Sequence, residues 1–134
     1  MKNKVFFKCP LPTQAIPMLN ELKKQGDKVN ERIFKGSSNE VDNVGCISLN
    51  TPNLNIKRLG FNADAHGVST TFTRFMSKSK KFSIEVSEAQ LSHKFATDQR
   101  LAYLGGETFY DERKEAVQYF ADWCDKQLAM FNRA

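Results

Sequence analysis

The residues in this sequence whose types and spacing could support acid–base chemistry are one carboxylate and two imidazoles. Asp64 and His66 are separated by a single residue, and His93 follows further along the chain. An imidazole titrates near neutral pH and a carboxylate can orient it, so these groups could bind a metal or move a proton. Nothing in the sequence brings His93 to His66, and Asp64 is equally suited to a turn in which it bonds its own backbone. These three residues are the candidates for catalysis.

A second set of residues could bind an anionic partner. Phe72 and four basic residues lie close together in the sequence, the basic ones being Arg74, Lys78, Lys80 and Lys81. If this segment is a two-stranded ribbon, its lysines can neutralise phosphates and an aromatic ring beside them can stack on a base. Lysine and serine are also typical of a solvated turn, and lysine protects exposed strand edges. We therefore take these five residues as the candidate binding site, with its partner left open.

The cysteines and glycines show no pattern of a cofactor site. Cys9, Cys46 and Cys124 are odd in number and far apart, which predicts reduced, mostly buried thiols. No Cys/His cluster with zinc-ligand spacing is present, and no glycine pattern of a phosphate-binding loop accompanies Gly105 and Gly106. The sequence therefore predicts no metal and no cofactor, and it favours a protein that is not an enzyme.

Helical periodicity is strongest at the C-terminal end of the sequence. Residues 111–133 place most of their apolar side chains in one wide arc, and residues 13–25 and 88–97 show shorter helical patterns. An apolar arc this wide is more than one sheet face normally covers, so the helix is expected to meet a second element or a second subunit as well. Two roles for these apolar side chains stay open: they complete the core of the domain, or they form the interface of a homodimer.

Alternating runs of residues predict a sheet. The predicted strands are 4–9, 43–49, 54–59, 68–76 and 81–87, and the last two are expected to form a hairpin. Residues 100–110 fit either a second hairpin or the end of a helix. The predicted fold is α+β: an antiparallel sheet of about four to six strands packed against an N-terminal helix and a long C-terminal amphipathic helix. The predicted domain organisation is a single domain, residues 1–134, since 134 residues suit one domain.

Charge completes the prediction of function. The formal net charge is +5, and the excess of basic over acidic side chains lies in residues 1–87. No apolar run approaches the length of a membrane span. We predict a small, non-enzymatic, cytoplasmic binding or accessory protein whose basic hairpin engages an acidic protein surface or a nucleic-acid backbone. The alternatives are a small hydrolase or nuclease-like enzyme centred on Asp64 and His66, and a purely oligomeric or structural protein.

Overall fold

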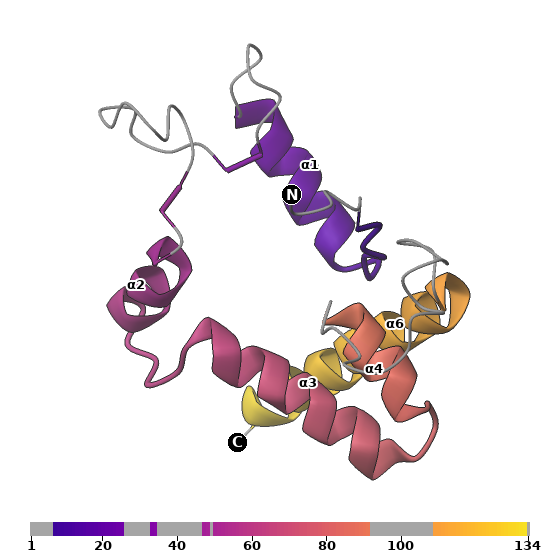
Figure 1. Cartoon of the computed structure of the whole chain (residues 1–134). Helices are drawn as coiled ribbons and strands as arrows, with labels where there is room; N and C mark the ends of the chain where they lie inside the picture. The colour runs from indigo at the N-terminus through magenta and orange to yellow at the C-terminus, as the bar shows by residue number, and fades with distance from the viewer. Residues whose placement is uncertain (1–6, 26–32, 35–46, 49, 92–108, 134) are drawn as a thin grey trace. The chain divides into compact units, whose positions relative to one another are not determined.

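The computed structural model describes residues 7–25, 33–34, 47–48, 50–91 and 109–133 of the chain (Figure 1). These residues form five helices and no strand: α1 (Ala15–Gln25), α2 (Thr51–Arg58), α3 (Ala65–Ser79), α4 (Ile84–Gln90) and α6 (Tyr110–Phe131). The predicted antiparallel sheet is therefore wrong. The chain divides into two compact units. Unit 1 comprises Met1–Pro12 with Ser69–Ala134, and unit 2 comprises Thr13–Val68. The single domain stays a prediction.

Both long helices expected at the two ends of the sequence are confirmed. Helix α1 lies inside the predicted range 13–25, and α6 nearly coincides with the predicted range 111–133. Asp111 and Glu112 occupy the first turn of α6, where negative charge is favoured by the helix dipole. In the part of the chain that the structure describes, no helix is long and apolar enough to cross a membrane.

The predicted hairpin of residues 68–76 and 81–87 is wrong, because these residues lie in or beside two helices. Val68, Phe72, Phe75 and Met76 also fit the i, i+4, i+7, i+8 spacing of a helix face, and α3 runs through all four. Side chains satisfy the free backbone donors at the start of α3. The amide of Gly67 donates to Asp64 Oδ1 at 2.6 Å, and the amide of Ala65 donates to Asn53 Oδ1 at 2.9 Å.

The turn between α3 and α4 is well defined. Lys80 takes a left-handed conformation with φ of 53°, a conformation that commonly ends a helix and usually belongs to glycine. The Ser79 hydroxyl donates to the carbonyl of Met76 at 2.8 Å, and the amide of Lys81 donates to Ser79 Oγ at 3.3 Å. Ser83, in an extended conformation, immediately precedes α4.

The remaining strand predictions are wrong or fall outside the described residues. Residues 54–59, predicted as a strand, lie almost entirely in α2, which begins with Pro52 in its first turn. The described residues of the predicted strands 4–9 and 43–49 are not in strands, and the others lie outside the described residues. The helix predicted at 88–97 overlaps α4 at residues 88–90, while residues 92–97 lie outside the described residues. So do residues 100–108.

The core of unit 1 forms where α3, α4 and α6 meet. Its buried apolar side chains are Phe72, Met76, Val86 and Ala116. Phe72 packs edge to face on Phe120, with ring centroids 5.3 Å apart at 87°. Five partly buried side chains surround this core: Phe75, Phe82, Leu91, Phe109 and Phe120.

Arg113 ties the N-terminal segment of unit 1 to two helices. Its side chain is buried; Nε donates to Gln90 Oε1 at 3.1 Å, and Nη2 donates to the carbonyl of Lys8. The guanidinium also lies over the ring of Phe7, 4.7 Å from its centroid. Burial lowers the pKa of Arg113. A charge-assisted pair of hydrogen bonds thus fixes residues 7–8 beside α4 and α6.

Candidate functional site

The four basic residues predicted as a binding site lie together at the end of α3. Arg74 and Lys78 are one turn apart on the same side of the helix, and Lys80 and Lys81 follow in the turn. We call these four residues the basic patch. All four are exposed, and among the described residues none of them makes a salt bridge. No acidic side chain among the described residues therefore neutralises the positive charge of the basic patch.

Lys81 differs from the rest of the patch because aromatic rings hold its ammonium. Its Nζ lies 4.6 Å from the ring centroid of Tyr119 and 5.4 Å from that of Phe82. Tyr119 belongs to α6, so this contact joins the patch to the C-terminal helix. Tyr119 was not among the predicted site residues. In the sequence, only the position of Tyr119 at the border of the apolar arc of α6 indicated that it could contact another group.

Phe72, the aromatic ring of the predicted site, lies in the core. Only 6% of its surface is exposed, and its ring packs on Phe120. A base can stack only on a ring with an accessible face. The structure therefore separates Phe72 from the basic residues with which the sequence grouped it.

Of the predicted catalytic candidates, Asp64 and His66 lie among the described residues, and neither lines the hollow found there. Asp64 and His66 are both exposed, and Asp64 uses one carboxylate oxygen to accept the amide of Gly67 at the start of α3. Asp64 therefore serves as a helix cap, in line with the backbone-bonding alternative. His93 lies outside the described residues. Within the described residues, no group of acidic, histidine and cysteine side chains could hold a metal.

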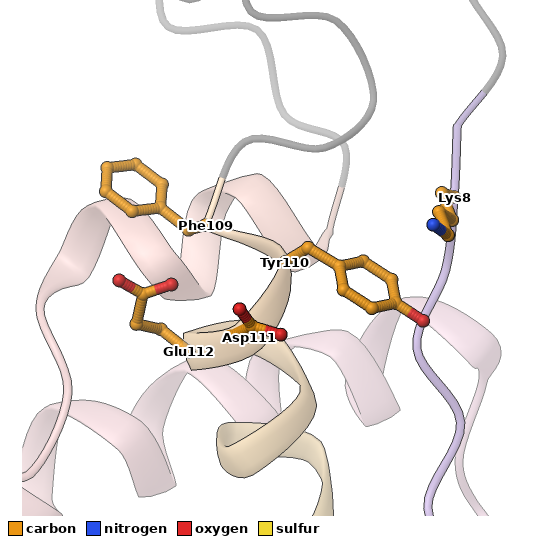
Figure 2. A pocket seen from close by; sticks show the side chains of 5 residues that line it. All are labelled: Lys8, Phe109, Tyr110, Asp111 and Glu112. Carbon is orange, nitrogen blue, oxygen red and sulfur yellow. The ribbon is translucent and has the colours of Figure 1, made fainter.

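A hollow of about 360 Å³ lies beside the first turn of α6 (Figure 2). It is lined by Lys8, Phe109, Tyr110, Asp111 and Glu112. Lys8 Nζ lies over the ring of Tyr110, 4.7 Å from its centroid. The two carboxylates of Asp111 and Glu112 outnumber the single ammonium, so the lining repels an anion such as phosphate.

The described cysteines correct the expectation of buried thiols, and the end of α6 bears on the expected homodimer. Cys9 and Cys124 are free and exposed rather than buried, and Cys46 lies outside the described residues. Although Cys124 is exposed as a residue, neighbouring atoms partly desolvate its thiol, and this desolvation and the nearby charge of Asp125 raise the pKa of the thiol. Toward its C-terminal end α6 exposes apolar side chains, among them Phe131 at 79%. A homodimer through this helix stays a prediction.

Comparison with known proteins identifies relatives among phage integrases. The chain is 33% identical to an integrase of Enterobacteria phage P4 over 130 residues, which cover 93% of this chain. It is 28% identical to an integrase of Shigella phage Sf6 over 130 residues, 96% of this chain. It is also 29% identical over 126 residues, 91% of this chain, to the putative protein IntB of Escherichia coli strain K12. No protein-family model and no solved structure matches the chain.

The chain spans only part of these relatives. The matched residues cover 28%, 32% and 31% of the P4 integrase, the Sf6 integrase and IntB respectively. The relatives and the helical fold together correct the predicted function. An accessory protein that works through a β-hairpin is wrong, and neither a hydrolase centred on Asp64 and His66 nor a purely structural protein is what these relatives indicate.

Proposed function

We propose that this chain is a DNA-binding region of an integrase-like protein and that its basic patch contacts the phosphate backbone. The observation that carries the proposal is the extended similarity to two proteins named integrase, over 93% and 96% of this chain. An integrase acts on DNA, and this similarity supports a contribution of the shared region to DNA binding.

The charge of the patch supports this role. Arg74 and Lys78 lie on one side of α3, and Lys80 and Lys81 extend the positive surface beyond the end of the helix. A helix end exposes backbone carbonyls, whose dipole favours the nearby cations. Side chains that are exposed and make no described salt bridge can approach phosphates without first breaking an ion pair.

The patch offers a narrow set of groups for reading a DNA sequence. It consists of one arginine and three lysines, it has no asparagine or glutamine that could pair with adenine, and Phe72 is buried in the core. Contacts to phosphate fix the position of a protein on DNA but carry no sequence information. We therefore propose binding to the backbone, with little dependence on base sequence and a strong dependence on salt.

The experiment is a fluorescence anisotropy titration of the protein against a short labelled DNA duplex at several salt concentrations. Four phosphate contacts give a slope of log K against log salt of about −3.6. The variant R74Q/K78Q removes two of the four cations without touching the core, so we expect weaker binding and a slope smaller in magnitude by about 1.8.

The matched control is K23Q/K114Q, which removes the same charge from two exposed lysines outside the patch. This control should bind DNA more tightly than R74Q/K78Q at every salt concentration and should keep the original slope. Equal losses in the two variants would show that only net charge matters and would refute the role of the patch. Absence of DNA binding by the unsubstituted chain, even at low salt, would refute the proposed function itself.

A further inference from the structure

The backbone of Lys81 is fixed by the turn that ends α3. Lys80, with φ of 53°, takes a left-handed conformation directly after the helix, and the amide of Lys81 donates to Ser79 Oγ at 3.3 Å. That hydroxyl in turn donates to the carbonyl of Met76, a core residue, at 2.8 Å. The position of the Lys81 Cα is thereby coupled to the last turn of the helix.

The side chain of Lys81 is fixed as well. Its ammonium lies 4.6 Å from the centroid of Tyr119 and 5.4 Å from that of Phe82, and the two rings are 6.0 Å apart. An aromatic ring attracts a cation placed over its negative face. Tyr119 is itself packed on Phe75, with centroids 5.2 Å apart, so the ring that receives the ammonium is anchored to the core.

The other members of the basic patch lack this support. Among the described residues, Arg74, Lys78 and Lys80 contact no aromatic ring through their charged groups. A lysine side chain has many rotamers, and ordering it against a ligand costs free energy. Lys81 is already partly ordered before any ligand arrives, so its contact with an anion carries a smaller entropic penalty.

We propose that Tyr119 is a positioning residue for DNA binding: it holds the Lys81 ammonium in place for contact with a backbone phosphate. This inference rests on the proposed function of the basic patch. The ring occupies one side of the ammonium, and Lys81 remains exposed, so donors of its NH3⁺ group stay available to phosphate oxygens. Lys81 is therefore the strongest single phosphate contact of the patch, and its strength depends on a residue of α6.

The test is a double-mutant cycle on DNA affinity with Y119L, K81Q and Y119L/K81Q. Losing the pre-ordering of one lysine should make Y119L bind DNA about two- to tenfold more weakly than the unsubstituted chain. In the K81Q background the same Y119L change should have no effect, because no ammonium remains to be positioned. The variant Y119F keeps the aromatic face and should bind like the unsubstituted chain. K81Q should also weaken binding more than K80Q, which removes a cation with no ring beneath it.

Folding is controlled separately, because Tyr119 also packs on Phe75. Each variant is checked by urea unfolding, and pentafluorophenylalanine in place of Tyr119 gives a second test that keeps the size of the ring but removes its negative face. That replacement should weaken DNA binding as Y119L does. Equal effects of Y119L with and without Lys81, or full affinity of the fluorinated protein, would overturn the role of Tyr119 while leaving the patch intact. If the unsubstituted chain bound no DNA, both the proposed function and the role of Tyr119 would be refuted.

Discussion

Replacing Lys80 with glycine should stabilise the protein while weakening its binding to DNA. Lys80 is in the left-handed region with φ of 53°, where the Cβ atom of an L-residue is too close to the carbonyl oxygen. This conformation costs a residue with a side chain about 1–2 kcal/mol. Glycine adopts it without that cost, but it gives the unfolded chain extra freedom worth roughly 0.4–1 kcal/mol.

The difference between these two terms sets the expected size of the effect. We expect K80G to be more stable than K80A by about 0.5–1 kcal/mol, because alanine removes the same charge and keeps the Cβ. For a unit of 60–100 residues this corresponds to a rise in Tm of about 2–8 °C. Comparison with K80A therefore separates the backbone effect from the effect of charge.

The assay is urea unfolding followed by the fluorescence of Trp123. This residue is the only tryptophan of the chain, and its ring lies 4.8 Å from that of Phe75, so it reports on the packing of α3 against α6. In the anisotropy assay K80G and K80A should lose the same affinity for DNA, since both remove one cation. If K80A were as stable as K80G or more so, Lys80 would not be strained in solution and the reasoning would be refuted.

Two further substitutions test the core of unit 1. S87A should raise the free energy of unfolding by about 1 kcal/mol, because Ser87 Oγ is buried and has no hydrogen-bond partner among the described residues; a lower midpoint in urea would indicate a hydrogen bond to that hydroxyl. F72A should lower the free energy of unfolding by about 3–5 kcal/mol, because it leaves a cavity beside Phe120. Normal stability of F72A combined with weaker DNA binding would contradict the placement of Phe72 in the core and would instead favour a role in base stacking.

The sequence was sufficient to locate α6 because its apolar residues repeat with helical spacing over 22 residues. It was not sufficient for α3. Four of the residues in the range 68–75 are β-branched, and alternation favoured a strand, although Phe72 and Met76 also share one helix face. The helix prevails in the structure because it buries both of these side chains in one core and because Asp64 caps its start.

The candidate site was partly predictable for a similar reason. Arg74, Lys78, Lys80 and Lys81 are near neighbours in the sequence, so they cluster whether the segment is a hairpin tip or a helix end. The contact between Lys81 and Tyr119 could not be predicted, since it depends on how α6 packs beside the α3–α4 turn. The position of Phe72 depended on the choice of period. At a period of two Phe72 lies on the same side as Arg74, whereas at 100° per residue the two are about 200° apart and Phe72 shares a face with Met76.

The hydrogen bond from Arg113 to the carbonyl of Lys8 has a consequence for how the chain folds as it is made. The two residues are 105 positions apart, so the N-terminal segment must wait on the ribosome until Arg113 has been synthesised. At 5–20 residues per second this delay is roughly 5 to 20 seconds. Residues Thr13–Val68 of unit 2 form a continuous stretch of chain, and all of them are synthesised within that interval. Unit 1 can be completed only later, after the first part of α6 has left the exit tunnel.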